Sequence, residues 1–140
     1  MTDQKPFNFP PPDDPSIGYS VTRRPDGGMH YVFTDTEHPT LLHWREFALA
    51  HLAAADHNTR NLYDLRQVRR LTQEALRLAL EVGNDPAARN VRTAVVVPSP
   101  EMAAALDEIS AISERGNFRV FTDPDEAEEW LAQPFSRLLK

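Results

Sequence analysis

Three arginines and a threonine lie where a predicted strand leads into a predicted helix. In the segment YDLRQVRRLTQE they are Arg66, Arg69, Arg70 and Thr72. Free backbone amides at a helix N-terminus attract anions, and guanidinium groups bind phosphate or carboxylate. These residues are therefore a candidate site for an anion or a charged partner. In the structural alternative, Asp64 accepts hydrogen bonds from the loop amides, the arginines are solvated and Thr72 only caps the helix.

A second cluster of polar residues, in RVFTDPDEAEEWL near the C-terminus, is explained by the start of a helix. Asp123 has the position and type of an N-cap, and Pro124 suits the first helical residue because its φ angle is fixed. Glu126 follows three residues after the cap, as in a capping box, where the positive helix end favours acids. We therefore predict a structural role for these acids.

The remaining reactive side chains lack the spacing of known sites. His43 and His51 are eight residues apart on one predicted helix, too far to share a metal ion. The five glycines form no phosphate-binding loop, and Ser99 lacks the flanking glycines of a nucleophile elbow. The absence of cysteine excludes thiol catalysis and cysteine-ligated metals. We predict no metal, no cofactor and no enzymatic activity.

The apolar pattern predicts an α/β fold. Alternating apolar residues from Ile17 to Phe33, interrupted by RPDGG, predict an N-terminal β-hairpin. Strand–helix units follow, with the continuous run VRTAVVV as a central strand covered on both faces. We expect a mixed, mostly parallel sheet of four to five strands with four helices. The further strands are predicted at 61–65, 91–97 and 118–121, and the helices begin at Pro39, Thr72, Pro100 and Pro124.

The predicted helices have apolar stripes that should face the sheet. In the second helix the stripe comprises Ala75, Leu76, Ala79 and Leu80. In the third it comprises Met102, Ala105, Leu106, Ile109 and Ile112. Leu71 and Leu76 also have the spacing of a hydrophobic staple around the Thr72 cap.

The 140 residues fit one domain, 17–140, preceded by a proline-rich tail, 1–16. No run of about 20 apolar residues and no signal-peptide pattern is present, so we expect no membrane association and a cytoplasmic location. The net charge of −6 argues against a nucleic-acid partner.

The charge is unevenly distributed along the chain. Residues 60–92 contain seven arginines and four acids, whereas residues 101–129 contain nine acids and two arginines. Opposite charges on one molecule favour either a charged protein partner or pairing with a second copy as a homodimer. A plain solvated surface is the alternative.

Taken together, the element order and three segments resemble STAS-type domains of the anti-sigma-factor-antagonist-like superfamily. The segments are YDLRQV, TAVVVPSPEMAAALDEIS and RVFTDPDEAEEWL, and the resemblance covers roughly residues 17–132. It is closest to small stand-alone bacterial members without an established function. The resemblance implies helices packed on a four- or five-stranded sheet, no cofactor and a role in protein–protein recognition.

The chain departs from this superfamily at the start of the second helix. Typical members have Asp-Ser-Ser/Thr-Gly there, and a partner kinase phosphorylates a serine. In this chain the corresponding residues are Leu71, Thr72, Gln73 and Glu74. Thr72 is the only hydroxyl available for such a modification, and we expect it to be usually unmodified.

Two hypotheses for the function follow. The first is a non-enzymatic protein-interaction or regulatory domain that uses the surface from Arg66 to Thr72. The second is a carrier of a small apolar or anionic ligand held between the helices and the sheet. The aromatic residues available for that site are Tyr19, Tyr31, Phe33, Trp44 and Phe47.

Overall fold

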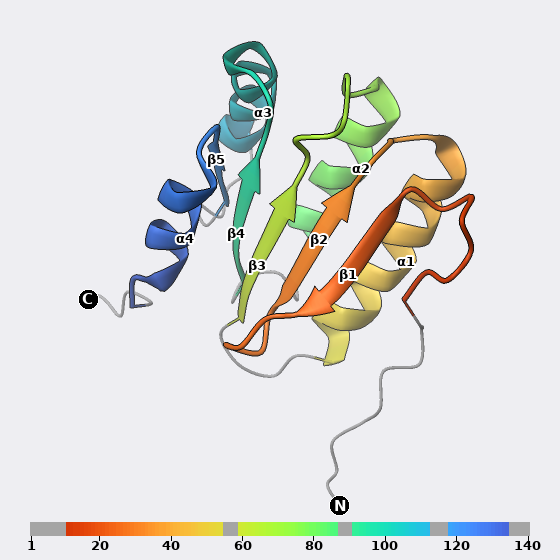
Figure 1. The fold of residues 1–140 in the computed structure, drawn as a ribbon, viewed down its shortest axis with the longest axis horizontal. Helices are drawn as coiled ribbons and strands as arrows, with labels where there is room; N and C mark the ends of the chain where they lie inside the picture. The colour runs from red at the N-terminus through yellow and green to blue at the C-terminus, as the bar shows by residue number, and fades with distance from the viewer. Residues whose placement is uncertain (1–10, 55–58, 87–90, 113–117, 135–140) are drawn as a thin grey trace, which may run out of the picture.

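The predicted hairpin opens a five-stranded sheet whose strands lie side by side in chain order (Figure 1). A computed structural model of the chain describes residues 11–54, 59–86, 91–112 and 118–134, without the side chains of 109–112. The elements are β1 (Tyr19–Arg23), β2 (Met29–Phe33), α1 (His38–Ala54), β3 (Thr59–Asp64), α2 (Gln73–Gly83), β4 (Val91–Val96), α3 (Pro100–Ile112), β5 (Phe118–Phe121) and α4 (Pro124–Ala132). The predicted α/β class and the order of elements are confirmed.

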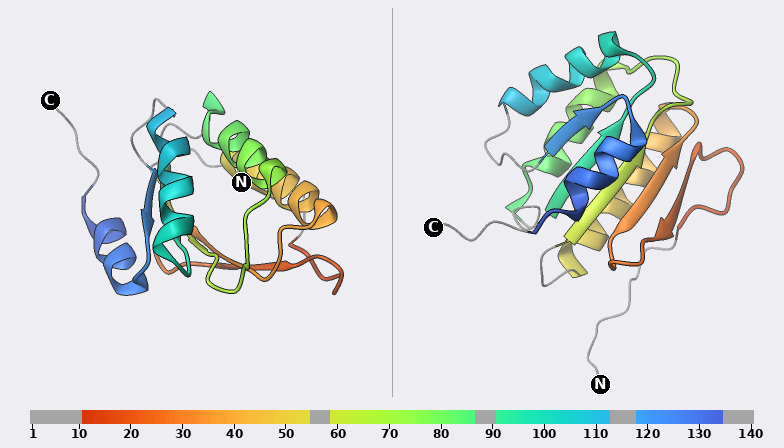
Figure 2. Two further views of the ribbon diagram at one scale, coloured as in Figure 1. Left: turned by 90° about the horizontal axis from the view of Figure 1, so that it is seen from above. Right: turned by 60° about the vertical axis from the view of Figure 1, so that its left-hand side comes forward.

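The sheet is mixed and mostly parallel. β1 pairs with β2 in antiparallel orientation, and β2 to β5 are parallel to one another. Each connection between neighbouring parallel strands is right-handed, and each leads to the next strand in the same direction across the sheet. The helices of these connections therefore lie on the same face of the sheet. Accordingly, α1, α2 and α3 cover one face of the sheet, while α4 packs on the other (Figure 2).

Two glycines shape the hairpin turn. Gly27 has a φ of 95°, a conformation that residues with a Cβ rarely adopt. A Cβ on Gly28 would collide with the carbonyl oxygen of Arg60 on β3. The turn therefore depends on glycine for its conformation and for the close approach of two backbones.

The main core lies between the sheet and helices α1 to α3. Met29, Tyr31 and Phe33 alternate inward along β2, and Trp44 and Phe47 face them from α1. The aromatic residues are in direct contact: the Tyr31 ring meets the Phe47 ring edge-on at 6.1 Å between centroids, and the Phe33 ring meets Trp44 at 6.2 Å. The hairpin and α1 therefore share one aromatic core.

β4 is buried on both faces, as predicted. Val95 faces the main core, whereas Ala94 and Val96 face a second cluster beneath α4. Ala127 and Leu131 of α4 are completely buried in that cluster.

Helix α4 is held to the sheet by charged groups as well as by its apolar face. Arg60 and Arg92, which lie opposite each other on β3 and β4, donate hydrogen bonds to backbone carbonyls at the end of this helix. Cations are favoured at the negative end of a helix, whose last carbonyls lack partners within it. Two arginines of the predicted basic surface therefore serve to anchor α4, and Glu128 pairs with Arg24 of the hairpin at 3.1 Å.

The predicted helix starts are confirmed, but some residues predicted to lie in the apolar stripes of the helices are not buried. Asp123 caps α4 by accepting a hydrogen bond from the Asp125 amide, and Pro124 is the first helical residue. On α3, Ala105 is exposed although it was expected inward. On α2, the buried residues are Ala75, Leu78 and Val82, because a 3.6-residue period rotates the inner face away from Leu80. The side chains of Ile109 and Ile112, and residues 1–10 of the predicted tail, lie outside the described part.

Candidate functional site

The four residues of the predicted anion site lie in the loop after β3 and at the N-cap of α2. The Arg66 guanidinium binds the Asp64 carboxylate at 2.8 Å, and this hydrogen bond holds the pKa of Asp64 below its usual value. Arg69 and Arg70 are exposed. The structure thus places Arg66 in a local ion pair and leaves the side chains of Arg69 and Arg70 at the surface.

Thr72 fulfils the helix-capping role. Its hydroxyl oxygen accepts a hydrogen bond from the Ala75 amide at 3.1 Å, and its backbone is extended, as expected of an N-cap. The loop before it is fixed to the loop that follows β2, because the Thr36 hydroxyl donates to the Arg70 carbonyl at 3.4 Å. Helix initiation therefore accounts for the oxygen of Thr72.

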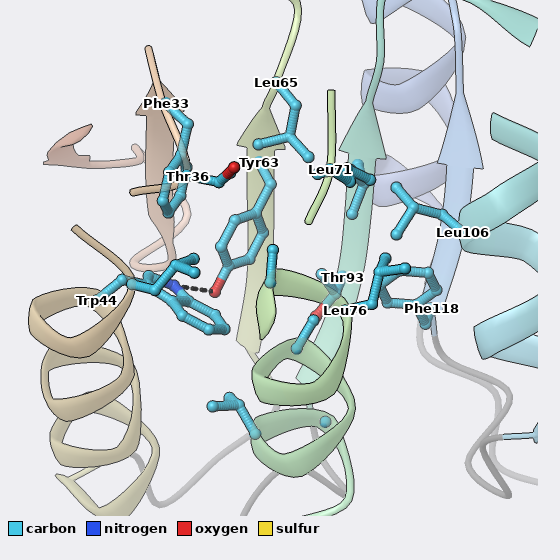
Figure 3. Close-up of a pocket in the computed structure, with 16 residues that line it drawn as sticks. Phe33, Thr36, Trp44, Tyr63, Leu65, Leu71, Leu76, Thr93, Leu106 and Phe118 are labelled. Carbon is cyan, nitrogen blue, oxygen red and sulfur yellow. Dashed lines mark hydrogen bonds between the residues drawn. The ribbon is translucent and has the colours of Figure 1, made fainter. Parts of the chain in front are cut away.

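A more enclosed site lies beneath α2, between this helix and the sheet. It is a cavity with a volume of about 110 Å³, and its lining is mostly apolar (Figure 3). Tyr63 of β3 lies at its floor, Trp44 of α1 borders one end, and Leu106 and Phe118 border the other. Leu71 and Leu76, the predicted staple pair, both line it.

Small residues on α2 leave this space open. Ala75, Ala79 and Gly83 line the cavity and recur every four residues, which places them along one side of the helix. A Cβ built on Gly83 meets no atom within 4 Å. Larger side chains at Ala75 and Ala79, which are buried and half-buried, would take up part of the volume.

Polar contacts at the surface connect α2 to α1. The His38 imidazole lies 2.6 Å from the Glu74 carboxylate, and the Arg45 guanidinium lies 2.6 Å from the Glu81 carboxylate. They set the position of the helix at its two ends, while the apolar side chains between them provide most of the packing energy.

A few polar groups reach the cavity. The indole N–H of Trp44 donates a hydrogen bond to the Tyr63 hydroxyl at 3.1 Å (Figure 3). The Tyr63 ring stacks on the Tyr31 ring with 4.3 Å between centroids and an angle of 8°. A tyrosine hydroxyl has an ordinary pKa of about 10 and is neutral at physiological pH, and burial raises the pKa of Tyr63 further. Thr36 and Thr93 contribute the other hydroxyls of the lining.

The described residues contain no group of three histidine or acidic side chains arranged to hold a metal ion. His43 instead pairs with the Tyr19 hydroxyl at 2.8 Å, and His51 is buried within α1. His57 lies outside the described part of the chain. No helix in that part has the length and apolar character needed to span a bilayer.

The sequence hypothesis of an internal ligand site named Phe33 and Trp44, which line the cavity, but missed Tyr63 and the small residues of α2. A detectable signal existed. Ala75, Ala79 and Gly83 form an Ala-x-x-x-Ala-x-x-x-Gly pattern within an otherwise ordinary amphipathic helix.

Comparisons with known proteins bear on the fold. Neither a family model nor a curated protein matches the chain. Among solved structures, it is similar to an uncharacterized protein of the DUF3478 family with a SpoIIAA-like fold from Shewanella loihica PV-4. The TM-score is 0.62 and the identity 18%, over 82% of this chain and 94% of the other. The chain has a SpoIIAA-like fold. This finding confirms the STAS-like architecture that the sequence predicted.

Proposed function

We propose that this protein is a non-catalytic binding module that takes up a small, largely apolar molecule in the cavity beneath α2. The observation that carries the proposal is the cavity itself, about 110 Å³ in volume and lined mainly by apolar side chains. Pockets for small molecules are typically apolar with a few placed polar groups. Here Tyr63 and Thr93 supply polar groups on the sheet side.

The spacing of small residues supports a site that is kept open. An unfilled cavity destabilises a protein by about 24 cal/mol per Å³, which for this volume gives an upper limit of about 2–3 kcal/mol. Gly83 is exposed and a methyl group there would meet no neighbour, so no clash requires glycine at this position. Occupation by a ligand explains why the helix presents alanine and glycine at this surface.

Titration of the protein with cumene, followed by amide NMR spectra, tests the proposal. We expect saturable shifts confined to residues around the cavity, such as Leu71, Leu76 and Thr93. The variant Ala79→Leu should abolish these shifts by filling the space, whereas Ala104→Leu, an equal change at an exposed position of α3, should not. Equal binding by both variants, or no saturable shift in the unmodified protein, would refute the proposal.

A second candidate function is recognition of a charged protein partner through the start of α2. It is supported by the exposure of Arg69 and Arg70 beside the Thr72 cap, and by the role in protein recognition that the superfamily resemblance implies. Reversal of both charges, Arg69→Glu with Arg70→Glu, should weaken capture of the partner. Reversal of Arg77, also exposed but further along α2, should not. Identical captured proteins from all three forms would contradict a role for this surface.

A further inference from the structure

The hydroxyl of Tyr63 is held rigidly at the cavity. Its ring lies between two aromatic neighbours, stacked on Tyr31 and edge-on to Trp44, whose ring centroid is 5.9 Å away at an angle of 80°. The Trp44 N–H donates to the hydroxyl oxygen and so determines which lone pair is occupied. A side chain restrained on both sides loses little further freedom when a ligand binds, and this favours specific recognition.

The hydrogen of this hydroxyl remains available for donation. A tyrosine hydroxyl offers one donor and two acceptor positions, and the indole N–H of Trp44 is itself only a donor. Besides burial, an interaction between the two hydroxyls raises the pKa of Tyr31 and lowers that of Tyr63, the directions expected when the Tyr31 O–H points at the Tyr63 oxygen, although the Tyr31 hydroxyl does not reach hydrogen-bonding geometry. Because burial keeps Tyr63 protonated, one neutral O–H donor is left beside an apolar cavity.

The other hydroxyls are less suited to this role. Thr36 donates its hydrogen to the Arg70 carbonyl, which leaves it without a donor for a ligand. Thr93 lies on β4, further from Trp44 and nearer to Phe118 (Figure 3). Thr93 therefore provides a matched control for Tyr63, since both hydroxyls belong to the sheet side of the same cavity.

The volume limits the size of the ligand. An engineered cavity of about 150 Å³ lined by apolar side chains binds benzene. At about 110 Å³, the cavity beneath α2 suits a molecule built around a single ring, with part of it extending toward the opening.

We propose that the ligand is an apolar molecule of single-ring size with one hydrogen-bond acceptor, such as a ketone or ester carbonyl, which accepts from the Tyr63 hydroxyl. This inference rests on the proposed function, because it specifies the chemistry of the molecule that the cavity takes up. It predicts discrimination between two probes of similar shape: acetophenone has a carbonyl oxygen where cumene has a methyl group.

Calorimetric titration of the unmodified protein, Tyr63→Phe and Thr93→Val with both probes tests the inference. A neutral hydrogen bond contributes about 0.5–1.5 kcal/mol, so Tyr63→Phe should weaken acetophenone binding about two- to twelvefold. Its affinity for cumene should stay within about twofold, which also shows that the variant keeps its fold and its cavity. Thr93→Val should leave the ratio of the two affinities unchanged.

A measurement on the unmodified protein gives a second readout. The carbonyl stretching frequency of bound acetophenone, labelled with carbon-13, should lie below its value in hexane, because hydrogen bonding weakens the C=O bond. The lower frequency should disappear in Tyr63→Phe. A frequency equal to that in hexane in the unmodified protein would overturn the inference without any variant.

The outcomes separate this inference from the proposed function. Failure of cumene to bind the unmodified protein would overturn the proposed function and with it the inference. If cumene binds, and if Tyr63→Phe has the same ratio of affinities for the two probes as the unmodified protein, the proposed function stands. The inference that Tyr63 is the donor is then refuted. If only Thr93→Val loses the preference for acetophenone over cumene, the donor is Thr93. That result would also refute the inference about Tyr63.

Discussion

Filling the cavity beneath α2 should stabilise the protein. Ala79 lies in the middle of the stripe of small residues on this helix and lines the cavity. The change Ala79→Leu adds three carbon atoms, and burial of each contributes about 0.8 kcal/mol, or about 2.4 kcal/mol in total. Restriction of the leucine rotamers opposes this by about 0.5–1 kcal/mol. We therefore expect the free energy of unfolding to rise by about 1–2 kcal/mol.

The expected gain agrees with an independent limit. The cavity volume implies a cost of at most about 2–3 kcal/mol, and the true cost is lower because the cavity opens to solvent. For a chain of 140 residues, a gain of about 1–2 kcal/mol raises the melting temperature by roughly 3–8 °C. Urea unfolding and calorimetry of the ligand-free protein measure both quantities, with Ala104→Leu on the exposed side of α3 as the control.

One result would refute this reasoning. If Ala79→Leu lowers the free energy of unfolding by more than about 1 kcal/mol while Ala104→Leu is neutral, the added atoms must force the helix off the sheet. The space beneath α2 would then be too small or wrongly shaped for a ligand of single-ring size.

Three further predictions concern the hairpin, the tyrosines and the helix cap. Gly28→Ala should destabilise the protein by more than about 2 kcal/mol in urea unfolding, because the added Cβ meets the Arg60 carbonyl. Gly83→Ala, in open space, should be neutral or stabilising by up to about 1 kcal/mol. Similar effects of the two changes would contradict the close backbone contact at Gly28. All three tyrosines have pKa values raised by burial, so absorbance should show almost no tyrosinate at pH 10, where exposed tyrosine is about half ionised. Because the pKa values of the tyrosines are higher in the folded state than in the unfolded state, their contribution to stability is complete below about pH 10 and declines above it. Ionisation of the tyrosines at pH 10 in the folded protein would contradict their burial. Thr72 should be unmodified in protein from its natural host, and an intact mass higher by about 80 Da that maps to Thr72 would contradict this expectation.

Local rules were sufficient for the hairpin turn and for the starts of α2 and α4, whereas β3 begins two residues before its predicted start. The caps at Thr72 and Asp123, the proline at the first position of α4 and the turn at Gly27 all depend on a few neighbouring residues, and the structure confirms each of them. The valine-rich strand was placed correctly in the interior of the sheet, between β3 and β5, because burial on both faces requires an apolar side chain at nearly every position.

The candidate site was less accessible to sequence reasoning. Arg66, Arg69 and Arg70 stood out because they are charged, yet the structure pairs Arg66 with its neighbour Asp64. Arg60 and Arg92 belong to the same basic segment, but they bind the carbonyls at the end of α4, which is about 40–70 residues away in sequence. A charged residue type indicates what a side chain can bind, but the sequence does not show which group it meets or whether it is solvated.

The amino-acid sequence alone determined the order of strands and helices, the mostly parallel sheet and the start of each helix, because these follow from short-range periodicity and capping. Only the tertiary structure decided that the small residues of α2 lie over Tyr63 and that Trp44 reaches the same point from another helix. A cavity is the space left between elements that are distant in sequence, so it depends on their packing distance and rotation, and neither quantity is encoded in any local segment.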